Sequence, residues 1–264
     1  MQITADLNDG RCAPCANTAG GGSKIRYWKS LLESPEGSRP DFEHLDRNGL
    51  GALHWAIDRG DKPLFSQALV AGAPIDQQTK HCKLSPLHYA ASVMSEFFLV
   101  SLLDRGAFID ARDRNRQTPL HYAAEGGSVA HATRLIEGGC CPKPFDRYKR
   151  SPLDLAFQHG RIQMIEYLVG IPDAKHRRWS DRLSFAVDRG QPEVVRWLLD
   201  RGANPKTKRD PYGRAILELS QKPFRAKDYR LDGYTEEQIK LLSDNHTQVR
   251  ELIEAAQSNQ WRTR

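Results

Sequence analysis

A short motif recurs along the chain at a nearly constant interval, and this recurrence limits the possible folds more than any other feature. The stretch "TPLHYAA" at residues 118–124 follows "SPLHYAA" at residues 85–91 after 33 residues. Looser copies lie around Ala56, Ala156, Ala186 and Ser220. The six copies are spaced at intervals of 34, 33, 33, 30 and 34 residues. A fixed period of this length predicts one array of stacked repeats rather than separate globular domains.

Each copy predicts two short helices separated by turns. The clearest first helices begin at Ser85, Thr118 or Ser151, each followed by Pro; a hydroxyl caps the helix, and the missing N–H of proline costs nothing in the first turn. Glycines are expected to end the helices in the left-handed conformation. They are Gly60, Gly127, Gly160 and Gly190 after the first helices and Gly72, Gly106, Gly139 and Gly202 after the second. One such helix pair cannot bury its own apolar face, so neighbouring pairs must stack.

The repeated unit resembles the ankyrin repeat, in which a T-P-L-H-x-A motif recurs with a period of about 33 residues. "LLDRGA" at residues 102–107 and 198–203 also resembles the ending of the second helix in that family. The resemblance is strongest from Asn48 to Pro205. It implies an all-α, ankyrin-repeat α-solenoid, in which helix–turn–helix repeats stack and present short β-turn tips.

We expect four segments along the chain. Residues 1–23 contain "TAGGGS" and no apolar periodicity, which predicts a flexible tail. Residues 24–45 predict an N-terminal half-repeat cap, and residues 46–205 hold five ankyrin-like repeats. Residues 206–264 predict a degenerate sixth repeat with an insertion and a C-terminal capping helix.

The insertion is expected at Phe224–Asn245 and the capping helix from about His246 to Gln257. "TEEQ" at residues 235–238 fits a capping box, so part of the insertion is expected to be helical.

Three histidines, His54, His88 and His121, occupy the same place in successive first helices. They cannot share one metal ion, because packed helices are about 10 Å apart and a His–Zn bond is about 2 Å long. We interpret each as a buried side chain that bonds the Ser or Thr three residues earlier, such as Thr118, and a neighbouring backbone carbonyl. Asp154, Ser184 and Glu218 replace this histidine in the last three copies, which puts its bridging role there in doubt. No metal and no cofactor are expected.

The five cysteines do not predict a disulfide framework. Cys12 and Cys15 form a C-x-x-C pair, but no second pair follows, so we expect them to be unstructured; a reactive role for the adjacent Cys140 and Cys141 is also not expected. The first residues, "MQITADLNDG", do not read as a signal peptide, and no apolar run of about 18 residues predicts a membrane span. A reducing compartment, cytoplasmic or nuclear, is therefore expected.

The sequence contains no phosphate-binding loop, zinc-protease motif or nucleophile elbow. Glu125, His159 and Asp188 fall at equivalent or adjacent first-helix positions and could in principle perform acid–base chemistry. Such residues at a helix end are more often solvated, so we do not expect an enzyme.

Positive charge is concentrated at the positions equivalent to those that the resembled family uses for binding. In the resembled family, binding usually uses the turn tips and the exposed ends of the first helices. These positions, aligned over the six copies, hold 13 Lys or Arg and three Asp or Glu, whereas the whole chain has a net charge of +6. Arginine, the commoner of the two, pairs bidentately with carboxylate or phosphate and stacks on aromatic rings.

We therefore expect a non-catalytic protein–protein interaction module, a monomeric scaffold or adaptor whose Arg-rich concave face captures an acidic protein or peptide. Alternatives are recognition of a polyanion (nucleic acid or a phosphorylated ligand), an atypical enzyme that uses the concave groove, and a merely solvated face. The expected partner-binding residues are Arg112, Arg114, Arg147, Tyr148, Arg150, His159, Arg177, Arg178, Trp179, Arg189, Tyr212 and Arg214.

Overall fold

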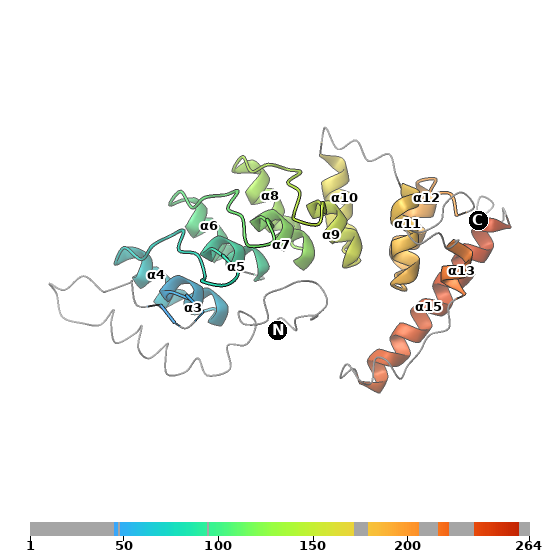
Figure 1. The fold of residues 1–264 in the computed structure, drawn as a ribbon, viewed down its shortest axis with the longest axis horizontal. Coiled ribbons are helices and arrows are strands. Elements are labelled where there is room, and N and C mark those ends of the chain that lie inside the picture. Colours follow the sequence, from blue (N-terminus) through green and yellow to red (C-terminus); the bar gives the residue numbers. More distant parts are fainter. Residues whose placement is uncertain are drawn as a thin grey trace. The chain divides into compact units, whose positions relative to one another are not determined.

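Short helices joined by turns make up the described part of the chain, and no strand occurs in it (Figure 1). The predicted tail, almost all of the half-repeat cap and the first half of the insertion lie outside it. The chain divides into two compact units, residues 1–155 and 156–264. The computed structural model describes residues 45–46, 48–93, 95–171, 179–205, 216–221 and 235–258.

The first unit is built from helix pairs. In Figure 1, α3, α5 and α7 form one row and α4, α6 and α8 a second row, and each first helix contacts the next. The bounds are α3 Ala52–Arg59, α4 Lys62–Val70, α5 Pro86–Ser92, α6 Glu96–Leu103, α7 Pro119–Gly126 and α8 Val129–Glu137.

Small side chains allow the first helices to approach closely. Ala56, Ala90 and Ala123 occupy equivalent positions on α3, α5 and α7 and are completely buried. The second helices supply larger side chains to the core, and Phe65 of α4 meets Phe98 of α6 edge-to-face, with ring centroids 4.9 Å apart. Such an aromatic pair stabilises beyond its buried area by about 1 kcal/mol.

The predicted helix boundaries are confirmed in the clearest copies. Ser85 and Thr118 are the N-cap residues of α5 and α7, and the following prolines are the first helical residues. All eight glycines expected to end helices have a positive φ, between 62° and 87°. These boundaries were predictable because each depends on the chemistry of one or two neighbouring residues.

The second unit contains the later helices of the chain. Helix α9, Pro152–Gln158, includes the boundary between the two units. The bounds of the others are α10 Ile162–Gly170, α11 Trp179–Asp188, α12 Pro192–Asp200, α13 Ile216–Ser220 and α15 Glu236–Gln257.

An aromatic cluster joins the helices at the start of the second unit. The rings of Trp179 and Trp197 meet edge-to-face at 5.5 Å, and Phe157 lies 5.8 Å from Trp197. The indole N–H of Trp197 donates to Glu166 at 3.2 Å, and the Arg201 guanidinium lies 3.8 Å above the Trp197 ring. Phe157 and Trp197 of this cluster are buried and belong to the core of the second unit.

The last helix is longer than expected. It begins at Glu236, whereas the sequence placed its start near His246, so that boundary was wrong. The predicted capping box is present: the Thr235 hydroxyl accepts from the Gln238 N–H at 3.3 Å, and the Gln238 side chain accepts from the Thr235 N–H at 2.8 Å. The second half of the insertion therefore forms the start of α15, which packs on α12 and α13.

Among the helices that the structure describes, none combines the length and the apolar character that crossing a membrane requires.

Candidate partner-binding surface

Buried carboxylates hold the turn tips of the first unit in shape. One oxygen of Asp146 accepts the backbone N–H groups of Tyr148 and Arg150, each at 2.8 Å. Asp113 accepts the Gln117 N–H in the preceding tip at 2.7 Å. Asp113 and Asp146 are only 7% and 3% exposed, so the acidic charge of these tips is directed inward.

Three basic residues at the tips have a left-handed backbone. Lys83, Arg116 and Lys149 have φ values of 56°, 62° and 60°. The first tip has Gly49 at the equivalent place, with a φ of 79°. This conformation costs a residue with a Cβ atom roughly 1–2 kcal/mol more than it costs glycine. Backbone preference therefore does not explain why Lys or Arg occupies these three positions.

Neighbouring repeats are joined by main-chain hydrogen bonds at the tips and by bonds from main chain to carboxylate in the turns after the second helices. At the tips, an N–H donates to a carbonyl of the preceding tip: Lys80 to Asn48 at 2.8 Å, Arg114 to Cys82 at 2.8 Å and Arg147 to Asn115 at 2.7 Å. In the turns after the second helices, a carboxylate accepts an N–H of the next repeat: Asp76 from Phe108 at 2.9 Å and Asp110 from Cys141 at 3.1 Å. These bonds fix the register of one tip against the next.

The outward side chains of these tips form what we call the basic tip surface. Its members are Lys80, Lys83, Arg112, Arg114, Arg116, Arg147 and Lys149. All seven are exposed, and none forms an ion pair with another residue in the described part of the chain. Two exposed aromatic side chains adjoin them, Phe145 at 56% and Tyr148 at 53% exposure. Arginines beside exposed aromatic rings are typical of binding hot spots.

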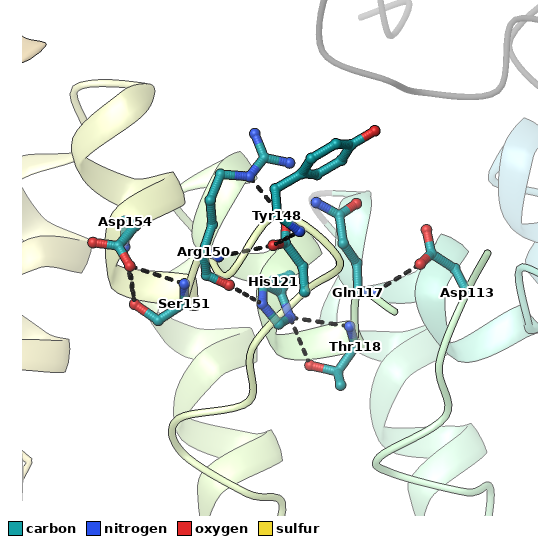
Figure 2. A network of polar contacts seen from close by, with 9 residues as sticks. Asp113, Gln117, Thr118, His121, Tyr148, Arg150, Ser151 and Asp154 are labelled. Atoms are coloured by element: carbon teal, nitrogen blue, oxygen red, sulfur yellow. Dashed lines mark hydrogen bonds and ion pairs between the residues drawn. The ribbon is translucent and has the colours of Figure 1, made fainter. Parts of the chain in front are cut away.

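Arg150 differs from these residues because it belongs to the internal structure of its tip (Figure 2). Its Nε donates to the buried Asp146 carboxylate at 2.9 Å, and its guanidinium lies 5.0 Å from the centre of the Tyr148 ring. The Tyr148 ring therefore covers one face of the Arg150 guanidinium, and Tyr148 stays exposed.

A buried histidine in each of the first three repeats connects its helix to the next repeat. Figure 2 shows His121, whose Nδ1 accepts the Thr118 N–H at 3.0 Å and lies 3.0 Å from the Thr118 hydroxyl. Its Nε2 donates to the Arg150 carbonyl at 3.2 Å, since a carbonyl can only accept. His88 repeats this arrangement with Ser85 and with the Gln117 carbonyl at 3.1 Å. For His54 the expected Ser or Thr was wrong, because the residue three positions earlier is Gly51; its N–H donates to Nδ1 at 3.3 Å, and Nε2 donates to the Leu84 carbonyl at 3.1 Å.

Burial keeps these histidines neutral. It lowers the pKa of His54, His88 and His121 from 6.5 to about 4. Burial has the opposite effect on a carboxyl group and raises the pKa of Asp113 to about 6, although Tyr122 donates to it at 3.0 Å. Within the described ranges, no three His, Cys, Asp or Glu side chains group closely enough to hold a metal ion.

Asp154 takes the place of the histidine in the fourth copy. Its carboxylate accepts the Ser151 N–H at 2.9 Å and the Ser151 hydroxyl at 2.7 Å, as Figure 2 shows. It therefore preserves the local helix start that the histidine provides in earlier copies.

The other expected partner-binding residues lie in the second unit or outside the described residues. Trp179 packs in the aromatic cluster, and Arg189 is exposed with its guanidinium 5.2 Å from the Phe185 ring. His159, at the end of the first helix of its repeat, is half-buried. The four outside the described residues are Arg177, Arg178, Tyr212 and Arg214.

Sequence reasoning did not select Lys80, Lys83, Arg116 or Lys149. The sequence does hold a signal for the unusual backbone of three of them, because Gly49 in the first copy aligns with Lys83, Arg116 and Lys149. A glycine at one copy of a turn indicates a left-handed position in the others.

The two adjacent cysteines have different environments. Cys140 is buried, which raises its pKa to about 12, whereas Cys141 is exposed. Cys140 therefore remains a thiol at physiological pH.

Family comparison agrees with the repeat architecture. A family model described as ankyrin repeats in three copies matches residues 93–178, and a second, for a single ankyrin repeat, matches residues 183–210. A search of curated proteins found no match. The two family matches identify ankyrin repeats within residues 93–210, and the helix pairs of the described residues are those of an all-α ankyrin solenoid.

Proposed function

We propose that this protein is a non-catalytic interaction module and that its basic tip surface captures an acidic segment of another protein. Ankyrin repeats generally mediate protein–protein interactions. The observation that supports the acidic partner is the charge arrangement at the tips. Seven basic side chains are exposed there without an ion pair in the described chain, while Asp113 and Asp146 are buried. Clustered like charge destabilises a protein unless a ligand neutralises it.

Arginine and aromatic residues together favour a protein partner. Arg112 donates through Nη1 to the Phe145 carbonyl at 3.4 Å, which brings its side chain beside an exposed aromatic residue. Carboxylates of a partner can pair with the guanidinium groups, and apolar side chains can cover Phe145 and Tyr148.

Fluorescence anisotropy with a labelled glutamate-rich peptide tests this function. The variant R112E/R114E/R147E should lose at least about tenfold in affinity, because three favourable pairings become repulsive. The control R105E/R196E/K240E makes the same change of charge at three exposed positions outside the basic tip surface. Equal losses in both variants, or no binding by the wild type, would refute the proposal.

The same titration with a DNA oligonucleotide distinguishes a polyanion site. Binding to phosphates should weaken with salt with a log–log slope of about −0.9 for each neutralised phosphate. If DNA binds more tightly than the peptide and its affinity falls more steeply with salt, the ligand is a nucleic acid and not an acidic protein.

A further inference from the structure

We propose that Lys83, Arg116 and Lys149 recognise an extended partner segment in the polyproline II conformation that carries an acidic residue at every third position. This inference rests on the proposed function and specifies the partner. It concerns one column of the basic tip surface, with one residue from each of three successive tips.

The backbone supplies the first argument. Each of the three residues has a left-handed conformation in which glycine or asparagine costs less, and the first tip does have Gly49 there. The turn hydrogen bonds to the side chains of Thr79, Asp113 and Asp146, one in each tip, impose this conformation. Residues kept in a strained conformation cluster at functional sites, and here all three are basic and exposed.

The spacing supplies the second argument. Neighbouring tips are tied by the hydrogen bonds from Arg114 to Cys82 and from Arg147 to Asn115, so their separation is that of adjacent packed helices, about 10 Å. A polyproline II segment has three residues per turn and rises about 3.1 Å per residue, so side chains three residues apart share one face about 9 Å apart. A β-strand would point side chains three residues apart to opposite faces.

Two peptides of identical composition test the proposed spacing. The first repeats Glu-Pro-Pro, and the second has its glutamates consecutive among the same prolines. Exposed ion pairs contribute about 2- to 5-fold each in affinity, so the wild type should prefer the repeating peptide by about 5- to 20-fold at low salt.

Two variants then assign the preference to its residues. K83N/R116N/K149N removes three charges, and asparagine tolerates the left-handed backbone, so this protein should be at least as stable as the wild type and should lose the preference. The matched variant K80Q/R114Q/R147Q removes three charges from the adjacent column; it should weaken both peptides and keep the preference.

The outcomes separate the two proposals. If neither peptide binds the wild type, the proposed function fails. If both bind equally well, or if K83N/R116N/K149N retains the preference, the function stands and the proposed recognition by these three residues is overturned.

Discussion

The buried histidines predict that the protein loses stability as the pH falls from 7 to 5. In His88, Nε2 donates to the Gln117 carbonyl, and Nδ1 accepts the Ser85 N–H at 3.1 Å. A proton on Nδ1 would face that N–H instead of accepting it. Protonation therefore removes the helix-start bond and charges a buried ring, and the same argument applies to His54 and His121.

The size of the effect follows from the lowered pKa values. A histidine with a folded-state pKa of about 4 and an unfolded value of 6.5 stabilises fully above pH 6.5, and this contribution is lost as the pH falls toward 4. Each histidine should cost about 2 kcal/mol between pH 7 and pH 5. Asp113 acts in the opposite direction: its pKa is raised from 3.8 to about 6, so protonation at pH 5 restores about 1 kcal/mol. The net loss should be about 4 to 5 kcal/mol.

Urea unfolding followed by far-UV circular dichroism at the two pH values measures this loss. In H88N the difference between pH 7 and pH 5 should shrink by about 2 kcal/mol. The asparagine side-chain oxygen can accept the Ser85 N–H, as the Asp154 carboxylate accepts the Ser151 N–H in the fourth copy, so the helix start is retained. His81 is exposed, and H81N is the matched control, for which the full pH difference should remain.

An H88N protein with the same pH difference as the wild type would refute the reasoning. Buried histidines would then not be the groups that make the fold acid-sensitive.

Three further predictions concern the turns and the cysteines. Gly49→Ala should lower the free energy of unfolding by at least about 1 kcal/mol more than Gly72→Ala. Both glycines have a positive φ, but a new Cβ atom meets a main-chain nitrogen, at 2.5 Å, only at Gly49. Equal effects of the two substitutions in thermal melts would contradict this. Asp146→Ala should cost about 3 kcal/mol or more in chemical denaturation, because a buried acceptor of three hydrogen bonds is lost, and a cost below about 1 kcal/mol would count against it. Iodoacetamide should label Cys141 and spare Cys140 in the native protein, which peptide mass spectrometry can check; labelling of both would show that Cys140 is accessible.

The helix pairs could be predicted from the sequence because their signals are local. A hydroxyl residue and a proline mark where α5 and α7 begin, and glycines mark where the helices end, whatever the rest of the chain does. The repetition of these signals also predicted the ankyrin architecture. The start of α15 was placed too late, although its capping box was recognised and part of the insertion was expected to be helical.

The candidate site was less predictable because its geometry depends on contacts within and between tips. The left-handed backbone at Lys83, Arg116 and Lys149 is imposed by turn hydrogen bonds and contradicts the preference of these residues. Similarly, the pairing of Arg150 with Asp146 follows from how the tip closes. Residue type alone does not distinguish an arginine held by its own turn from one available to a partner.

The bonds between repeats have a consequence for how such a chain can change in length. At the tips of the first unit, each repeat offers its neighbour the same main-chain donor and acceptor in the same register. Excision of residues 85–117 would join Leu84 to Thr118, and His121 would follow His54 in the row. The Arg147 N–H would then donate to the Cys82 carbonyl, which loses its present donor, the Arg114 N–H, when the segment is removed. Gain or loss of one whole period among these repeats thus leaves the main-chain bonds between their tips matched, so tandem duplication or deletion of the gene segment can change the length of this part of the array.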